Sequence, residues 1–474
     1  MPRPSTHVRR GIGVSIAGMV MASAATATSA QSIRPLAYSR TVLSNGLVLL
    51  VNEDHSVPVV GMDVVYHIGA KDEQTGHTGL AHLCEHLMGQ GSPNEPLQAK
   101  VFMQSLGATS SRWATTSEDV TSYFMTVPSN QLETALWLES DRMAMPLTRA
   151  DQAQVDGARE VIRQERAQSR DGVVGELAKS VTLPFVTDAP YHIDPVGPMM
   201  DLNVATAKDA KAFCLPYYVP NNAILSLSGD VAAARAKVLV EKYFGTIQRG
   251  PEPRHPVISA AHGTTVVRTV LEDARLRTPG VQRAWPGASF ANPDRPALIA
   301  LASILSRDRT GRLTRALVYD RPLALRVVAF NADLEQAGVF QVNVTPRAGV
   351  SLTTIEQVMD SVINDVKEHG VTAAEIEPFT RANAIEAVTT LQSRLMRADT
   401  LANGEGFAHD PAAYAKQVNQ AFSLTPADVV RAARNYLGSF GMMMSMIPSG
   451  KLDLISKPEL PYTNVTPTVA KATP

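Results

Sequence analysis

The segment from His82 to His86 constrains this chain more than any other stretch, because its side chains act together only on a helix. Residues four positions apart lie on one face of a helix, and Glu85, three residues after His82, shares that face. Two neutral imidazoles one turn apart can fill two corners of a tetrahedral Zn²⁺ site. A carboxylate beside the metal can accept the proton of an attacking water. Because so short a pattern also arises by chance, the rest of the chain has to support this interpretation.

Length and composition are those of an ordinary globular protein. The chain has 474 residues, enough for two or more domains, with 45% hydrophobic and 19% charged residues. Its formal net charge is -1. No overall field therefore favours nucleic acid or an anionic membrane surface as a partner.

The first thirty residues have the pattern of a secretory signal peptide. Basic side chains come first, namely Arg3, His7, Arg9 and Arg10. An apolar stretch over 11–25 follows, and small residues lead to a predicted cleavage site near Ala30–Gln31. An uncleaved anchor is the alternative, but the apolar run is short, and no later stretch could span a bilayer. We expect export to the periplasm and leave residues 1–30 out of the fold.

The chain has two cysteines, Cys84 and Cys214, which could pair in an exported protein. Cys84, however, lies inside the predicted zinc helix, and the spacing of the two matches no metal-binding framework. We therefore interpret them as two separate, buried, small apolar side chains.

The order of predicted strands and helices indicates an α+β protein with two similar domains. In the first half, strands are predicted over 39–52 (two strands joined at the Asn45–Gly46 turn), 59–68, 109–127 and 222–230. Helices are predicted over 96–106, 131–145, 153–168, 205–214 and 232–244, in addition to the motif helix, for which Thr78 is the predicted N-cap.

Residues 248–263 are rich in Pro and Gly and form the predicted linker. Beyond it the order recurs, with strands over 264–271, 281–285, 323–330, 338–344 and 441–447, and helices over 296–305, 355–368, 374–403 and 426–437. The second half carries no second zinc motif. We expect an N-terminal domain over 31–247 and a C-terminal domain over 264–455, each a largely antiparallel sheet packed with helices. A poorly ordered tail is expected over 456–474.

From Gly79 to Gly89 the sequence resembles the pitrilysin/insulinase family of zinc peptidases, which includes the mitochondrial processing peptidases and carries the inverted motif His-x-x-Glu-His. The segments 121–128 and 132–143 resemble the family's region after the zinc helix, 217–230 its closing strand, and 301–324 the start of its second domain. The resemblance covers roughly residues 38–450. It implies a zinc-dependent endopeptidase whose two domains form a half-chamber, with Glu85 as the catalytic base.

The resemblance also implies a third zinc ligand, a glutamate on a later helix. Glu160 and Glu165 are the candidates on the predicted helix over 153–168. They are five residues apart and cannot both face one metal. The local sequence before Glu165 matches the family, which assigns Glu165, together with the two histidines, to a single Zn²⁺.

Two departures from the family concern the surroundings of this site. Seven positions before Glu165, where active members commonly carry another glutamate, stands Ala158. Where the family places an arginine and a tyrosine that hold the substrate backbone, this chain has Val318 and Leu325, whose side chains cannot donate hydrogen bonds. Such a chain resembles the zinc-bearing subunit of the family's two-subunit enzymes. We therefore predict a heterodimer with a homologous partner that supplies the Arg/Tyr pair.

In the family, the substrate adds as a strand to the edge of the first sheet, which favours extended, unfolded peptides. The matching edge lies near 111–116, with Ser111, Arg112 and Trp113 as candidate peptide contacts. An inert, zinc-binding assembly subunit is the alternative function. The departures described above favour this alternative, whereas the intact zinc motif favours the peptidase.

Overall fold

The computed structural model describes residues 32–109, 113–168 and 199–465, together with 178, 181–185, 187, 191 and 195–197. The predicted signal peptide and its cleavage site lie outside these residues. Within them, no helix combines the length and the apolar composition that crossing a membrane requires.

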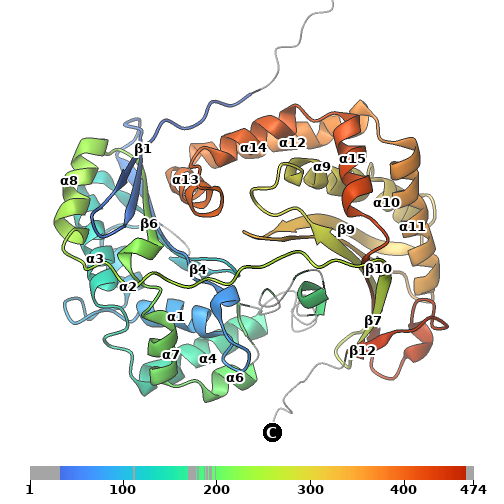
Figure 1. The fold of residues 1–474 in the computed structure, drawn as a ribbon, viewed down its shortest axis with the longest axis horizontal. Helices are drawn as coiled ribbons and strands as arrows, with labels where there is room; N and C mark the ends of the chain where they lie inside the picture. Colours follow the sequence, from blue (N-terminus) through green and yellow to red (C-terminus); the bar gives the residue numbers. More distant parts are fainter. Residues whose placement is uncertain are drawn as a thin grey trace, which may run out of the picture. The chain divides into compact units, whose positions relative to one another are not determined.

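Six strands form a first sheet in the order β1-β2-β6-β3-β5-β4 (Figure 1). Their bounds are β1 Ser39–Val42, β2 Val48–Glu53, β3 Val59–Tyr66, β4 Ala114–Thr116, β5 Thr121–Pro128 and β6 Ala223–Gly229. All neighbouring strands are antiparallel except β2 and β6. The β1–β2 hairpin forms at the predicted Asn45–Gly46 turn, where Gly46 has a φ of 95°, which glycine adopts without steric penalty.

Helices of the first half, among them the one with the zinc motif, pack on one face of this sheet. Their bounds are α1 Leu80–Met88, α2 Ala99–Ser105, α3 Leu132–Ala144, α4 Gln152–Gln168, α6 Met199–Val204, α7 Ala207–Cys214 and α8 Ala233–Phe244. Alternate residues of β3, such as Met62 and Val64, point into a core shared with Leu83 and Leu87 of α1. This packing fixes the direction in which the histidines of α1 point.

A second sheet repeats the first in the order β12-β7-β11-β8-β10-β9. Its strands are β7 Val266–Asp273, β8 Gly280–Gly287, β9 Ala324–Asp333, β10 Gly338–Pro346, β11 Gly441–Pro448 and β12 Thr463–Val465. The helices of this half are α9 Arg295–Ser306, α10 Arg312–Thr314, α11 Leu352–His369, α12 Ala373–Gln392, α13 Arg394–Ala408, α14 Ala413–Phe422 and α15 Pro426–Tyr436. Only the pairs β12–β7 and β7–β11 are parallel. Two mainly antiparallel sheets packed with helices confirm the predicted α+β class.

The long helix predicted over 374–403 is in fact two helices, α12 and α13. They meet at Ser393, which has an extended backbone, and its hydroxyl accepts a hydrogen bond from the N–H of Met396 at 3.3 Å. Serine favours this capping role because its side chain replaces a missing intrahelical partner. A serine also occurs inside uninterrupted helices, so hydrophobic periodicity alone does not locate the break.

Of the tail expected to be poorly ordered, residues 456–465 are described and make defined contacts, whereas 466–474 lie outside the described residues. Ser456 is buried, and its hydroxyl donates a hydrogen bond to Glu356 at 2.5 Å. Further along, β12 pairs with β7 and extends the second sheet. The Pro and Thr content of this segment gave no indication of this strand, because strand pairing at a sheet edge depends on a partner that is distant in the sequence.

Helix α13 belongs to the second half in sequence but packs on the first sheet, on the face opposite to α1. Val65, which alternates with the core residues of β3, contacts Ala402 of this helix. The approach is close, since a Cβ atom on Gly61 would lie 2.4 Å from the backbone nitrogen of Leu395. Glycine at this position therefore allows the helix to reach the sheet.

The second sheet is covered in a reciprocal way by residues that precede it in the chain. Ala178 and Leu183, among the described residues between α4 and α6, pack against Met442 and Met444 of β11. Each sheet thus buries one face under a segment from the other half. The two proposed domains therefore do not pack independently, because each contributes a segment that covers the sheet of the other.

Two carboxyl groups meet where α13 crosses the first sheet. Asp63 on β3 is fully buried, and Asp399 of α13 lies against it. Burial, followed by the proximity of Asp399 and Glu139, raises the pKa of Asp63 well above its ordinary value. Burial also raises the pKa of Asp399 to about 6, although Asn403 donates a hydrogen bond to it at 3.0 Å. Protonation of one of the two carboxyl groups relieves the repulsion of like charges.

We expect Asp399→Asn to raise stability at high pH. Because its pKa is raised in the folded protein, the folded state holds more protons than the unfolded chain between about pH 4 and pH 6, and the wild type loses stability as pH rises through this range. Asparagine carries no charge, so the variant should exceed the wild type by about 1–3 kcal/mol in free energy of unfolding at about pH 8. Thermal unfolding should show a larger Tm difference at about pH 8 than at about pH 4.

Asp308→Asn, on the exposed surface, is the matched control and should leave Tm unchanged at both pH values. A Tm difference for Asp399→Asn that does not vary with pH would contradict the prediction.

Candidate metal centre

Helix α1 begins at a glycine and is capped by a glutamate from outside the helix. Gly79 precedes α1 with a φ of 83°, a conformation that favours glycine. The Glu73 carboxylate accepts hydrogen bonds from the backbone N–H groups of Gly79 and Ala81, both at 2.7 Å. Its charge also complements the positive end of the helix dipole. The prediction that Thr78 caps the helix is wrong, because its hydroxyl donates to Asp201 at 2.6 Å instead.

The two histidines of α1 and one glutamate of α4 bring their ligand atoms together. The Nε2 atoms of His82 and His86 are 3.2 Å apart. Oε2 of Glu165 lies 3.6 Å from Nε2 of His82 and 3.4 Å from Nε2 of His86. The imidazoles are each 15% exposed, whereas Glu165 is 49% exposed and borders solvent. The three atoms therefore converge on one point at the edge of the protein interior.

These distances fit a tetrahedral Zn²⁺ site. With ligand bonds of about 2.0–2.1 Å, two ligands of a tetrahedral ion lie about 3.3 Å apart, close to all three distances. Burial, followed by the neighbouring His86, lowers the pKa of His82 to about 4, so its imidazole is neutral at pH 7. A neutral imidazole keeps the lone pair that a metal requires. The three side chains could hold one Zn²⁺ and leave a fourth position for water or substrate.

The other candidate ligand, Glu160, lies away from the histidines. It is exposed and pairs with Arg163 at 2.5 Å. Ala158, on the same helix, is buried in the core. Nδ1 of His82 is also buried, and no hydrogen-bond partner for it is found among the described residues. A histidine that binds a metal through Nε2 ordinarily donates the hydrogen on its Nδ1 to a carboxylate or carbonyl. The side chain of Ala158 cannot accept such a hydrogen bond.

Glu85 shares the face of α1 that carries the histidines and is 7% exposed. A carboxylate oxygen of Glu85 and one ring nitrogen from each histidine all lie within 4.8 Å of one another. Its Oε2 accepts a hydrogen bond from the Thr116 hydroxyl at 2.6 Å. The motif thus offers a carboxylate next to the three ligand atoms, where it could accept a proton.

A disulfide joins Cys84 of α1 to Cys214 of α7, with 6.2 Å between their Cα atoms. The prediction that the two cysteines stay separate is wrong. Cys84 is two residues from each histidine, which on a helix directs its side chain away from theirs, and α7 packs beside α1 (Figure 1). The disulfide therefore fixes the zinc helix from its rear side without competing for the metal.

Of the predicted peptide contacts, Ser111 and Arg112 lie outside the described residues. Trp113 is half-buried, and the Arg142 guanidinium lies 5.3 Å from the centroid of its ring. A Cβ atom on Gly89 would come within 2.5 Å of the same ring. Trp113 therefore packs against the end of α1, as much a structural contact as a candidate substrate contact.

The two positions of the expected Arg/Tyr pair lie on different elements of the second half. Val318 sits in a single turn of π-helix, η4 (Arg315–Tyr319), and packs on the second core. Leu325 lies on the edge strand β9 and is 56% exposed. The neighbouring Tyr319 lies beside Arg309, whose guanidinium is 5.8 Å from its ring centroid.

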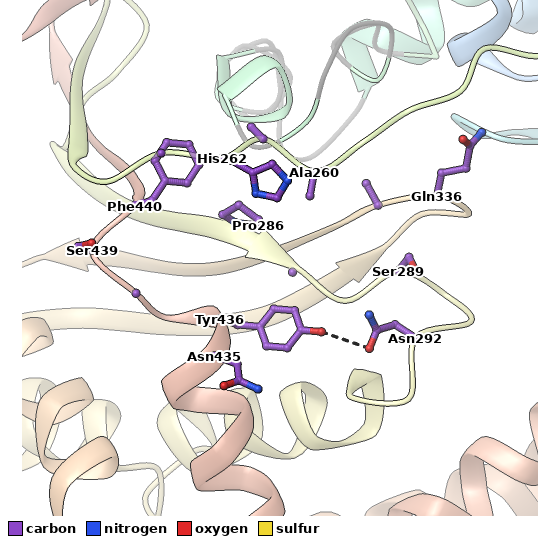
Figure 2. A pocket seen from close by; sticks show the side chains of 15 residues that line it. Ala260, His262, Pro286, Ser289, Asn292, Gln336, Asn435, Tyr436, Ser439 and Phe440 are labelled. Atoms are coloured by element: carbon purple, nitrogen blue, oxygen red, sulfur yellow. Dashed lines mark hydrogen bonds between the residues drawn. The ribbon is translucent and has the colours of Figure 1, made fainter.

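A groove of about 480 Å³ is formed by residues of the second half and the end of the predicted linker. Figure 2 shows Tyr436, at the end of α15, in a hydrogen bond with Asn292 at 3.2 Å on one side of this groove. His262 is the sole imidazole among the lining residues, and none of them is a carboxylate or cysteine. The described residues that line the groove therefore offer no set of metal ligands.

Glu73 and Thr116 contact the motif helix, and the sequence analysis did not identify either. Glu73 lies just after the 3₁₀ turn η1 (Ala70–Asp72), and Thr116 ends β4. No spacing rule relates these positions to the motif, because they reach α1 only when loop and sheet fold around it. An acidic residue shortly before a helix that lacks a good N-cap was the one available indication for Glu73.

Comparison with family models matches residues 48–195 to "Insulinase (Peptidase family M16)" and residues 205–378 to "Peptidase M16 inactive domain". The chain belongs to this peptidase family. The zinc protease PqqE of Helicobacter pylori is 27% identical to it over 443 residues, covering 90% of this chain and 96% of that protein. A probable mitochondrial-processing peptidase subunit beta of Arabidopsis thaliana is 22% identical to this chain over 325 residues. The match covers 65% of this chain and 59% of that protein.

The fold also matches the crystal structure of a protease from Helicobacter pylori. The TM-score is 0.78 at 24% identity, and the match covers 88% of this chain and 100% of that one. This similarity establishes the two-domain M16 fold. Names of the relatives support zinc as the metal, and the convergence of His82, His86 and Glu165 offers a place for it.

We expect Glu165→Gln to weaken zinc retention, because an amide oxygen replaces a charged ligand. Zinc per chain, measured by plasma mass spectrometry after dialysis against a weak chelator, should fall from about one towards zero. Glu160→Gln, the same change on the same helix, is the matched control and should keep the wild-type zinc content. Equal zinc loss in both variants would argue against Glu165 as the ligand.

Proposed function

We propose that this chain is a zinc-dependent endopeptidase that hydrolyses extended peptides, with a single Zn²⁺ held by His82, His86 and Glu165. The observation that carries the proposal is the convergence of two imidazole nitrogens and one carboxylate oxygen at tetrahedral spacing, 3.2 to 3.6 Å apart, beside Glu85. If the two buried histidines had no catalytic role, a second carboxylate, that of Glu85, on the same face of α1 would serve no purpose.

In the proposed reaction, each side chain has a distinct task. Bound Zn²⁺ would lower the pKa of a water towards about 7 and polarise the scissile carbonyl. Glu85 accepts the proton of the attacking water and later delivers it to the leaving amine. Its low exposure keeps bulk water from competing for this proton. Burial keeps His82 neutral and able to bind a cation, and the disulfide at Cys84 holds the helix that carries all three motif residues.

The edge of the first sheet suits extended peptides as substrates. Among the described strands, β4 is the outermost of this sheet and pairs with β5, so its other edge can add a further strand. Strand addition uses main-chain hydrogen bonds, which gives loose sequence preference and excludes folded proteins. Ser111, Arg112 and Trp113, just before or at the start of this edge, remain the proposed peptide contacts.

We further propose that the protein is exported to the periplasm and acts with a homologous partner. The N-terminal pattern of residues 1–30 and the disulfide both support an oxidising compartment. Val318 and Leu325 support the partner, since neither side chain can hold a peptide by hydrogen bonds. The relative named as a processing-peptidase beta subunit is in keeping with a zinc subunit that works in a pair.

A zinc-binding assembly subunit without activity is the second candidate. The buried Ala158 favours it, as does Nδ1 of His82, for which the described residues offer no hydrogen-bond partner, because a ligand ring without an outer hydrogen bond weakens a metal site. The complete set of His82, Glu85 and His86 favours the peptidase.

We expect Glu85→Gln to abolish peptidase activity and to leave zinc binding intact. Loss of a general base typically costs about 10²–10⁴-fold in rate, and an amide of the same shape leaves the ligands in place. Hydrolysis of a fluorogenic, unstructured peptide is measured together with zinc content, in the presence of the partner. Equal hydrolysis by the wild type and Glu85→Gln would rule out the peptidase and favour the assembly subunit.

We expect the purified chain alone to turn over peptides slowly, and addition of the homologous partner to raise kcat/KM by about 10-fold or more, because the partner supplies the peptide-holding side chains. The same fluorogenic assay, run across a titration of partner, measures this. A chain that alone matches the turnover of the pair would contradict the heterodimer.

A further inference from the structure

The carboxylate of Glu85 is held by a residue from a different element. The Thr116 hydroxyl on β4 donates a hydrogen bond to Glu85 Oε2 at 2.6 Å. Glu85 itself lies on α1 and is 7% exposed. The contact therefore joins the edge strand of the first sheet to the middle of the zinc helix.

The hydroxyl proton of Thr116 is committed to Glu85. In this contact the hydroxyl is the donor and the carboxyl oxygen is the acceptor. The other nearby hydroxyl belongs to Thr121, 3.4 Å away, and it donates its own proton to the backbone carbonyl of Ile68 at 2.9 Å. The two threonines thus serve different acceptors.

The backbone holds Thr116 in a defined position. Thr116 pairs with Thr121 across β4 and β5, and the N–H of Ser117 donates to the carbonyl of Val120 at 2.9 Å, which closes the turn between the strands. The Ser117 hydroxyl accepts a hydrogen bond from the N–H of Val120 at 3.1 Å and reinforces the turn. A β-branched side chain in a strand also has few rotamers. The donor is therefore pre-organised.

We propose that Thr116 is a positioning residue for catalysis, which fixes the orientation of the Glu85 carboxylate next to the ligand atoms of His82 and His86. This inference rests on the proposed peptidase function. Because β4 is also the edge to which a peptide would add, one strand sets both the position of the substrate and the orientation of the base. Misorientation of the base would slow the chemical step without weakening the main-chain contacts of the substrate.

The test compares Thr116→Val with the wild type in the presence of the partner. Valine keeps the shape and the strand preference of threonine but removes the hydroxyl. We expect kcat to fall about 10- to 100-fold, the usual effect of losing a partner of a catalytic group, with KM changed less than about twofold and zinc content unchanged. Thr116→Ser, which keeps the hydroxyl, should recover most of kcat.

Thr463→Val is the matched control. Thr463 is an exposed threonine on strand β12 of the second sheet, away from the proposed site, so the identical change should leave kcat at the wild-type value. An unchanged kcat for Thr116→Val, or a loss as large for Thr463→Val, would overturn the proposal.

Two further comparisons keep the result interpretable. If Thr116→Val fails to fold, Thr116→Ala and Thr116→Ser differ by the hydroxyl alone, and equal kcat values for these two would overturn the proposal. Glu85→Gln separates the two levels of inference. If the kcat of the wild type exceeds that of Glu85→Gln but equals that of Thr116→Val, the result supports the peptidase function and overturns the role of Thr116.

Discussion

Two imidazoles can converge on one ion only if the helix that carries them neither rotates nor slides, and much of the first half constrains α1 in this way. Its apolar side, including Leu83 and Leu87, is buried against the first sheet. Glu73 caps its first turn, and the disulfide from Cys84 fixes its rear side. Each constraint acts on a different part of the helix, so that few rigid-body movements remain. The 3.2 Å separation of the histidine nitrogens depends on all of them.

The two sheets share the topology of five strands, β2-β6-β3-β5-β4 and β7-β11-β8-β10-β9, but differ in what they support. In the first, the strand at the edge of the sheet holds the candidate base through Thr116, whereas the corresponding strand of the second, β9, exposes Leu325 to solvent. Nevertheless the halves are not independent, because α13 covers the rear face of the first sheet. The buried contact of Asp63 with Asp399 makes this packing sensitive to proton concentration. The sheet under the zinc helix is thus stabilised in part by the second half.

Much of the fold could be predicted from local patterns. The β-branched run of β3 and the Asn45–Gly46 turn could be predicted because both depend on steric rules that act within a few residues. The errors have a common origin in contacts between distant segments. Ser393 breaks a helix where its hydroxyl finds a backbone N–H, and β12 forms because β7 offers an unpaired edge. The choice of Glu165 over Glu160 came from resemblance, since spacing alone left both open.

By itself, the sequence determined that His82, Glu85 and His86 share one face of a helix, because the helical repeat depends only on local backbone geometry. Two imidazoles and one carboxylate on that face suffice to indicate a metal and a base. Only the tertiary structure decided which groups surround that face: Glu165 at the ligand atoms, Thr116 on the carboxylate, Cys214 behind the helix. These contacts span up to 130 residues of sequence. They form when the sheet and the helices pack around α1, and no periodic pattern along the chain predicts such contacts between distant segments.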